Sequence, residues 1–249
     1  MTQILAHRGY AKAFPENTML AFKEAAKYPI AGFELDVHLT KDGVPVICHD
    51  EDIKRTSNGS GFIKDMTLAD LRSYLFTNGM VREGGAREDL LIPIMEDFLA
   101  WLQKGSLIVN IELKTNIFPY PGIEKKLVDM VRGFSLEKRV IFSSFNHHTI
   151  RRIQTLCDIP CGFLTDSGLL RPGAYCRDRG VSFYHPNYRT LEDEDFEDLM
   201  AHGIGLNPYT VDDEEAMIFL TEKGADYIIT NDVAKACRVL SSQDASSLI

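Results

Sequence analysis

Residues 32–48 read GFELDVHLTKDGVPVIC, two apolar runs joined by the four residues Thr40 to Gly43. Asp-Gly between two apolar runs predicts a hairpin. Four residues cannot hold the crossover that a parallel neighbouring strand requires, so the second run, residues 44–48, should return antiparallel to the first. This short strand is then an excursion from the main sheet, and it is left out when the main strands are counted.

Eight apolar runs remain, and they alternate with amphipathic patterns along the whole chain. The predicted strands are residues 4–6, 32–35, 107–111, 140–142, 162–164, 181–184, 204–206 and 227–229. The predicted helices are residues 18–28, 94–103, 122–133, 148–156, 191–201 and 213–223, the first of them capped by Asn17. Near-continuous apolar runs indicate parallel strands buried on both faces. Eight of them favour a TIM (β/α)8 barrel, with a doubly wound open sheet as the alternative.

The length of 249 residues suits one domain, residues 1–249. Residues 51–92 interrupt the alternation with several glycine-rich turns, and we interpret them as an insertion after the second strand that carries one short helix, residues 67–74. It follows His49 directly, so it either forms a wall of the active site or is a surface insertion without a chemical role. The polar tail, residues 241–249, is expected to be frayed.

The net charge and the cysteine content limit the partners and the cellular compartment that we expect for this protein. The net charge of −9 argues against nucleic acid as a partner and against stable association with anionic membranes. A phosphate-bearing substrate must therefore be drawn in by a local cationic site. Five cysteines, an odd number without a CxxC pair, indicate reduced thiols and a cytoplasmic protein. We recognise no signal peptide and no apolar stretch of membrane-spanning length.

Acidic residues end two of the predicted strands, at the edge where an α/β barrel carries its active site. Glu34 and Asp36 are two positions apart on one strand, so their side chains point to the same side, and Glu112 ends the next strand of the barrel. Carboxylates this close repel unless a cation lies between them. An all-oxygen set suits Mg²⁺ or Ca²⁺. The alternative is a barrel rim in which Arg8 or Lys114 forms ion pairs with Glu34 and Asp36, and a Glu112 placed beside them would argue against it.

Two histidines and two cationic side chains accompany this acidic cluster. His7 and His49 titrate near neutral pH, as general acid–base catalysis requires, although a single histidine at a strand end is more often only hydrogen-bonded. Arg8 can bind a phosphate bidentately, and Lys114 can meet the same phosphate as a point charge. Together these residues predict metal-assisted cleavage of a phosphate ester.

The order of these motifs resembles the glycerophosphodiester phosphodiesterase family over nearly the whole chain. The segments that carry the resemblance are Ala6-His7-Arg8-Gly9, Pro15-Glu16-Asn17-Thr18, Glu34-Leu35-Asp36-Val37, Thr40-Lys41-Asp42-Gly43-Val44-Pro45-Val46, His49-Asp50 and Ile111-Glu112-Leu113-Lys114. Further matches are Asn58-Gly59, Leu68-Ala69-Asp70-Leu71, Ile92-Pro93, Ser143-Ser144-Phe145 and Ile228-Ile229-Thr230-Asn231-Asp232. The resemblance implies a TIM barrel that hydrolyses glycerophosphodiesters to glycerol 3-phosphate and an alcohol.

The resemblance also implies residue roles. It implies Glu34, Asp36 and Glu112 as ligands of Mg²⁺ or Ca²⁺, His7 and His49 as the acid–base pair, and Arg8 and Lys114 as phosphate ligands. Glu16 and Asn17 are implied to hold the His7-Arg8 loop. Many family members have Trp where this chain has Tyr209. Tyr209 can still form an apolar wall for the glycerol moiety.

Two rival functions remain at this point. A phospholipase acting on intact lipids would need an exposed apolar loop or a basic rim at the barrel mouth. A barrel that binds phosphodiesters without cleaving them would not need both histidines. The expected partner is a small-molecule glycerophosphodiester.

Overall fold

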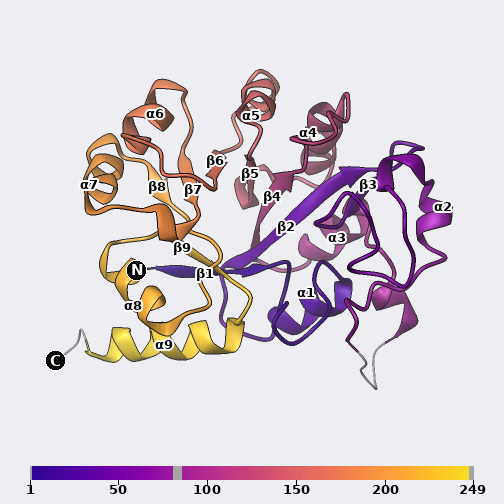
Figure 1. Cartoon of the computed structure of the whole chain (residues 1–249), viewed down its shortest axis with the longest axis horizontal. Helices are drawn as coiled ribbons and strands as arrows, with labels where there is room; N and C mark the ends of the chain where they lie inside the picture. Colours follow the sequence, from indigo (N-terminus) through magenta and orange to yellow (C-terminus); the bar gives the residue numbers. More distant parts are fainter. Residues whose placement is uncertain (1, 81–85, 247–249) are drawn as a thin grey trace.

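The computed structural model describes residues 2–80 and 86–246 (Figure 1). Its strands are β1 Gln3–His7, β2 Gly32–Leu39, β3 Pro45–Ile47, β4 Ile108–Leu113, β5 Val140–Ser144, β6 Cys161–Thr165, β7 Phe183–Pro186, β8 Gly205–Leu206 and β9 Tyr227–Thr230. Its helices are α1 Met19–Ala25, α2 Leu68–Leu71, α3 Met95–Leu102, α4 Ile123–Gly133, α5 His147–Gln154, α6 Pro172–Asp178, α7 Asp193–His202, α8 Glu214–Glu222 and α9 Val233–Ser246. Short 3₁₀ turns are Ile63–Asp65, Arg87–Leu90, Glu137–Arg139 and Tyr188–Thr190.

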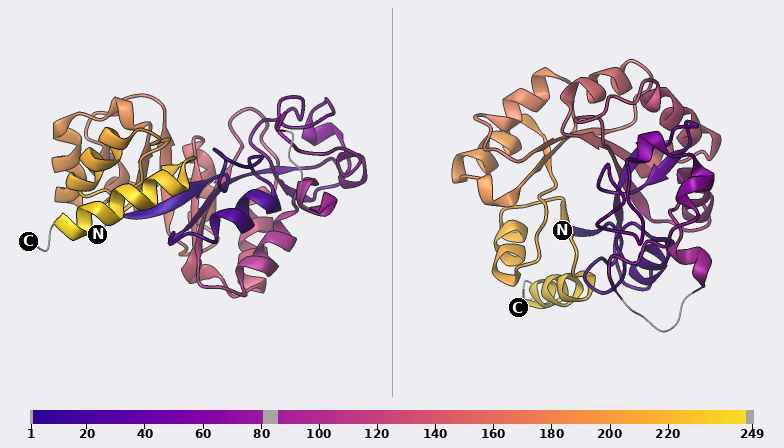
Figure 2. Two further views of the ribbon diagram at one scale, coloured as in Figure 1. Left: turned by 90° about the horizontal axis from the view of Figure 1, so that it is seen from below. Right: turned by 45° about the vertical axis from the view of Figure 1, so that its right-hand side comes forward.

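The parallel strands form a nearly closed barrel in the order β8-β7-β6-β5-β4-β2-β1-β9. β9 pairs with β1, with Gln3 opposite Tyr227, and so joins the two ends of the chain. Two backbone hydrogen bonds connect the β8 and β9 regions and close the barrel. They run from Asp226 N to Leu206 O (2.9 Å) and from Ile229 N to Pro208 O (3.1 Å). The helices form a ring around the strands in the right view of Figure 2. The (β/α)8 prediction is confirmed, and the open-sheet alternative is wrong.

The hairpin predicted from residues 32–48 is present. β3 lies antiparallel to β2, with Val37 opposite Ile47 and Leu39 opposite Pro45. Gly43 turns the chain with φ 77°, a left-handed conformation that glycine adopts without strain. The Thr40 hydroxyl accepts a hydrogen bond from Val44 N at 2.9 Å. The turn thus closes locally, and β3 delivers the chain to His49.

The predicted helices occur within a few residues of their expected positions, and the structure differs at one helix cap and in two further helices. Thr18, rather than Asn17, caps α1, because its hydroxyl accepts the hydrogen bond from Ala21 N. The sequence interpretation missed α6 and α9. α9 continues to Ser246 and packs Val233 against the core, so residues 241–246 of the tail that was expected to be frayed are assigned to the end of this helix. Residues 247–249 lie outside the described part of the chain.

Successive side chains of β2 point to opposite faces of the strand, so one face packs against helices and the other faces the barrel interior. Phe33 contacts the rings of Phe22 on α1 and Phe98 on α3, with centroid distances of 5.6 and 6.0 Å. Its neighbour Glu34 therefore faces the opposite side of the strand, into the barrel, because successive side chains of a strand alternate. Asp36 follows two positions later on the same side. The apolar face fixes the strand against the helices and presents the carboxylates to the interior.

Residues 51–80 and 86–92 lie at the right of Figure 1, beyond the end of β2, and contain α2. They share a small apolar cluster with β3, made of Val46, Cys48, Ile53, Ile63, Leu71, Phe76 and Ile92. Thr67 caps α2 in a reciprocal capping box with Asp70. Residues 81–85 of the expected insertion lie outside the described residues. This segment thus has a core of its own beside the barrel mouth.

Within the described ranges, no helix is long and apolar enough to cross a membrane.

Candidate active site

A pocket of about 440 Å³ opens at the carboxyl ends of the barrel strands. The residues lining it are His7, Arg8, Glu34, His49, Glu51, Glu112, Lys114, Asn116, Ile117, Phe145, Leu164, Asp166, Tyr209, Thr210 and Ile229. The structure therefore brings together seven of the ten side chains that the sequence singled out. The other three, Glu16, Asn17 and Asp36, lie behind the wall and hydrogen-bond or pair with residues of the site.

Three carboxylates form the floor of this site. Asp36 on β2 lies opposite Glu112 on β4, and oxygens of Glu34, Asp36 and Glu112 all lie within 4.8 Å of one another. Burial, together with the charges of Asp36 and Glu112, raises the pKa of Glu34 well above its usual value. Glu34 Oε2 has no hydrogen-bond partner among the residues described. The cluster therefore concentrates negative charge that its protein partners compensate only in part.

Arg8 and Lys114 face these carboxylates. Lys114 Nζ lies 2.9 Å from Glu112 Oε1 and 3.6 Å from Asp36 Oδ1, and Arg8 Nε lies 3.4 Å from Asp36 Oδ2. Burial lowers the pKa of Lys114, but Glu112 and Asp36 more than reverse that effect, so Lys114 is charged. The ion-paired rim considered from the sequence is thus present for Asp36, and Lys114 pairs with Glu112 as well. Among the described residues, Arg8 and Lys114 form no ion pair with Glu34 at contact distance, although their charges partly offset the rise in its pKa.

The donor set fits one hard divalent cation. Mg²⁺ and Ca²⁺ bind oxygen ligands at about 2.0–2.6 Å, so oxygens sharing one ion lie within about 5 Å of one another. The spacing of Glu34, Asp36 and Glu112 meets that condition. The unpartnered Glu34 Oε2 supplies a buried oxygen that such an ion would satisfy.

His7 is held by a chain of hydrogen bonds from the end of β9. Asp212 accepts a hydrogen bond from Asn231 Nδ2 at 2.7 Å, which turns the amide oxygen of Asn231 toward His7. That oxygen lies 2.7 Å from His7 Nδ1, so Nδ1 carries the proton. The other ring nitrogen, Nε2, lies 3.7 Å from Glu34 Oε2. Burial and the Arg8 charge lower the pKa of His7 to about 3, so the ring is neutral.

His49 is held in a similar way by its neighbour. His49 Nδ1 lies 2.6 Å from Asp50 Oδ1. The hydrogen bond from His49 and those from Arg55 hold the pKa of Asp50 well below its usual range, so Asp50 accepts and His49 Nδ1 donates. Both histidines therefore keep Nε2 as the nitrogen available for proton exchange in the pocket.

Glu16 and Asn17 tie the loop after β1 to the site. Asn17 Nδ2 donates to Asp36 Oδ2 at 2.8 Å, and Asn17 N donates to Arg8 O at 2.9 Å. Glu16 Oε1 accepts from Arg8 Nη1 at 3.0 Å. Asn17 thereby orients the carboxylate of Asp36, and Glu16 orients the guanidinium of Arg8.

Tyr209 follows β8 and forms part of the pocket wall. Its ring meets the edge of Phe145 with centroids 5.9 Å apart. Its hydroxyl lies within hydrogen-bond distance of Thr165 O (2.9 Å) and Asp166 Oδ1 (2.8 Å), both of which can accept its proton. The polar end of Tyr209 is thus engaged at the wall, and the ring lines the pocket.

The sequence interpretation did not assign roles to Asn231, Asp212, His38 or Arg55. His38 is buried on β2, with Nε2 3.1 Å from His49 O and Nδ1 3.0 Å from the Tyr120 hydroxyl. Asn231 lies in the segment Ile228–Asp232 that carries part of the family resemblance, directly after an apolar run, so its position was a usable signal. Arg55 lies in the irregular segment and had no such signal.

The fold and the site define the class of protein as a (β/α)8 barrel enzyme. Such enzymes carry their active sites at the carboxyl ends of the strands, where this barrel has its acidic cluster, its two oriented histidines and its two cations. A model of the glycerophosphoryl diester phosphodiesterase family matches residues 7–235. The chain therefore belongs to this family of phosphodiester-hydrolysing enzymes.

Individual relatives agree with this assignment. The chain is 38% identical over 232 residues to a glycerophosphodiester phosphodiesterase of Caldanaerobacter subterraneus, covering 93% of this chain and 94% of the relative. It resembles the crystal structure of a glycerophosphodiester phosphodiesterase from Parabacteroides distasonis with a TM-score of 0.82, 26% identity and 98% coverage of each chain. The fold also matches an Oleispira antarctica phosphodiesterase in complex with the product sn-glycerol-3-phosphate, with a TM-score of 0.82, 24% identity and coverage of 98% and 97%.

Proposed function

We propose that this enzyme hydrolyses glycerophosphodiesters to glycerol 3-phosphate and an alcohol, with a divalent cation and with His7 and His49 as the acid–base pair. The observation that carries the proposal is the orientation of both imidazoles. Each has Nδ1 bound to an acceptor outside the pocket, Asn231 for His7 and Asp50 for His49, which leaves Nε2 of both rings for proton transfer. The product bound by the Oleispira antarctica neighbour supports glycerol 3-phosphate as the product here.

Glu34, Asp36 and Glu112 would hold Mg²⁺ or Ca²⁺. When bound, such an ion neutralises charge on the phosphodiester as a Lewis acid. The support is the unpartnered oxygen of Glu34 and the mutual proximity of the three carboxylates.

Arg8 and Lys114 would bind the phosphate oxygens of the substrate. Both are cationic, both line the pocket, and both are anchored by carboxylates that prevent them from turning away. Negative charge on the phosphate oxygens grows as the nucleophile attacks, and preoriented cations stabilise that charge more strongly than water does. Tyr209 would form the apolar wall for the glycerol moiety, while Glu16 and Asn17 hold the His7-Arg8 loop.

One histidine, neutral with an unprotonated Nε2, would take the proton of the nucleophile, and the other, carrying a proton on both ring nitrogens, would give its Nε2 proton to the departing alkoxide. The nucleophile is water or the 2-hydroxyl of the substrate's own glycerol, in which case a cyclic phosphate forms and is hydrolysed afterwards. Both routes need two imidazoles that exchange protons in one pocket. A barrel that only bound phosphodiesters would need neither.

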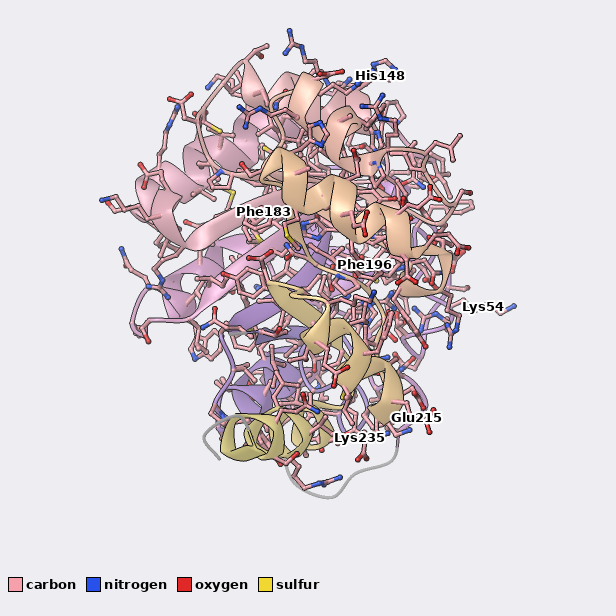
Figure 3. The ribbon with its side chains drawn as sticks, turned by 90° about the vertical axis from the view of Figure 1, so that its left-hand side faces the viewer. Lys54, His148, Phe183, Phe196, Glu215 and Lys235 are labelled. Atoms are coloured by element: carbon pink, nitrogen blue, oxygen red, sulfur yellow. The ribbon has the colours of Figure 1, made fainter. Side chains whose placement is uncertain are left out.

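The decisive experiment is an assay of glycerol 3-phosphate release from glycerophosphocholine with Mg²⁺ or Ca²⁺ present. We expect His7→Ala and His49→Ala each to lower turnover by about 10²- to 10⁴-fold, the range for one general acid–base group. His148→Ala is the matched control, because that side chain is exposed at the edge of the molecule (Figure 3). Wild-type turnover in both pocket variants would show that the assignment is wrong. Binding of the substrate without release would favour the non-catalytic barrel.

One observation keeps the phospholipase alternative open to test. Ile117 lines the pocket and is 61% exposed, and Phe62 is 45% exposed and packs against Phe118 with ring centroids 5.5 Å apart. These side chains would suit an apolar substituent on the substrate. Activity on phospholipid vesicles with none on glycerophosphocholine would favour that function.

We further propose that the enzyme acts in the cytoplasm on small-molecule substrates. All five cysteines carry free thiols, three of them buried, which fits a reducing compartment.

A further inference from the structure

We propose that Arg55 is a positioning residue that orients His49 and Arg8 at the same time. Arg55 lies in the segment that follows the β2–β3 hairpin, outside the regular barrel. The inference rests on the proposed function for its catalytic meaning, and it gives that segment a role in the site.

The Arg55 guanidinium forms a fork between two carboxylates. Nε and Nη2 donate to Asp50 Oδ2 and Oδ1 at 2.6 and 3.0 Å. Nη1 and Nη2 donate to Glu16 Oε2 and Oε1 at 2.9 and 2.8 Å. Each carboxylate is therefore bound through both of its oxygens, a geometry that fixes its rotation as well as its position.

The Asp50 side of this fork leads to His49. Asp50 Oδ1 is the acceptor for His49 Nδ1 at 2.6 Å, so the rotation of the Asp50 carboxylate sets the direction of the imidazole. Without the fork, Asp50 could turn toward solvent, since its side chain is 29% exposed. His49 would then lose the acceptor that keeps its proton on Nδ1.

The Glu16 side leads to Arg8. Glu16 Oε1 accepts from Arg8 Nη1 at 3.0 Å, while Arg8 Nε faces Asp36. Hydrogen bonds from Arg55 and the charge of Arg8 outweigh the effect of burial and lower the pKa of Glu16, so it stays ionised. Two loops that come from different strands, those after β1 and after β3, are thus locked to each other by one side chain.

Lysine cannot replace this arrangement. Its ammonium is a single point with three donors, whereas the planar guanidinium matches two carboxylates bidentately. An exposed ion pair by itself contributes little to stability, so a network of this kind at the pocket mouth is better explained by orientation. The Arg55→Lys variant therefore keeps the positive charge and loses the bidentate hydrogen bonds to Asp50 and Glu16.

The kinetic test compares Arg55→Lys with two controls under saturating divalent cation. Arg152→Lys alters an arginine of similar exposure, which donates to Glu124 Oε1 at 2.6 Å away from the pocket. Lys54→Gln alters the neighbouring side chain, which extends away from the molecule (Figure 3). We expect Arg55→Lys to lower kcat by about 10- to 100-fold and to raise the KM of glycerophosphocholine, with both controls at the wild-type level. Unchanged kcat and KM in Arg55→Lys would overturn the inference.

A second variant separates orientation from general weakening of the fold. In a His49→Ala background, Arg55→Lys should lower kcat no further, because the group it orients is gone, yet it should still raise KM through Arg8. The same fold-loss of kcat in both backgrounds would contradict action through His49.

A third measurement does not depend on activity. NMR of protein labelled in its histidine rings reports which nitrogen of His49 carries the proton. We expect the wild type and Arg152→Lys to hold the proton on Nδ1, and Arg55→Lys to populate both tautomers. An unchanged His49 signal in Arg55→Lys would refute the positioning role, even if the enzyme proved to act on another substrate. A changed signal with no turnover of glycerophosphodiesters by the wild type would instead count against the proposed function alone.

Discussion

His7 Nδ1 lies 2.7 Å from Asn231 Oδ1, although the two residues are 224 positions apart in the chain. The contact exists because β9 pairs with β1 and ends beside it. Asp212 completes the arrangement by accepting both the Asn231 side-chain N–H and its backbone N–H. The first catalytic candidate is therefore oriented by the last strand of the barrel.

Replacing Asn231 tests this orientation. Asn231→Ala removes the acceptor for His7 Nδ1 and should lower kcat for glycerophosphocholine by about 10- to 100-fold, as loss of an orienting partner commonly does. Asn58→Ala is a suitable control, because the amide oxygen of Asn58 accepts from Leu75 N in the segment outside the barrel. Steady-state kinetics at saturating cation measure the effect. Equal kcat in the two variants would show that His7 needs no partner at Nδ1.

Glu34 offers a test of the cation site by stability alone. We expect Mg²⁺ or Ca²⁺ to raise the melting temperature of the wild type, because a ligand bound only to the folded state stabilises it. Glu34→Gln removes one charge from the buried cluster, so it should raise the melting temperature in EDTA and weaken the response to the cation. Glu215→Gln, on the exposed side of α8, serves as the control (Figure 3). The same cation response in Glu34→Gln and in the wild type would exclude Glu34 as a ligand.

His185 should make the fold sensitive to acid. Burial lowers its pKa to about 3, below the value of about 6.5 in the unfolded chain. The unfolded state therefore binds the proton first, so the contribution of His185 to stability is complete above about pH 6.5. It is lost as the pH falls toward 3, at up to about 1.4 kcal/mol per pH unit.

Denaturant titrations at several pH values between 7 and 4 measure this effect. In the His185→Asn variant, the free energy of unfolding should fall less steeply as the pH is lowered, by up to about 1.4 kcal/mol per pH unit. This difference in slope is expected even if the variant is less stable than the wild type at pH 7. His148→Asn, at an exposed position, should keep the wild-type slope. A wild-type slope in His185→Asn would mean that this imidazole is not the group responsible.

Two substitutions of Tyr209 distinguish the role of its ring, as an apolar wall, from the role of its hydroxyl, as a polar contact. Tyr209→Phe keeps the ring and loses the hydroxyl that reaches Thr165 O and Asp166, so it should cost about 1 kcal/mol of stability with little change in KM. Tyr209→Ala removes the ring and should raise the KM of glycerophosphocholine about tenfold, which corresponds to about 1.4 kcal/mol of lost apolar contact. If the phenylalanine variant were as impaired as the alanine variant, the hydroxyl would be the important part of Tyr209.

Local signals in the sequence predicted most of the barrel. Apolar runs, the Asp-Gly turn after β2 and the alternation around Glu34 each depend on neighbours a few positions away, and each reappears in the structure. α6 and α9 escaped prediction for a local reason as well. α6 is short and begins at Pro172, and the second half of α9 is polar, with its apolar contacts to the core, such as Val233, concentrated in the first half.

The sequence by itself determined the barrel class, the hairpin and the set of acidic, cationic and imidazole side chains at the strand ends, because strand period and residue order are local properties. Only the tertiary structure decided which partners orient them. Asn231 reaches His7 through closure of the barrel, and Arg55 joins Asp50 to Glu16 across two loops that fold against each other. Such contacts depend on where distant segments meet in space, and no periodic pattern in one sequence encodes that distance.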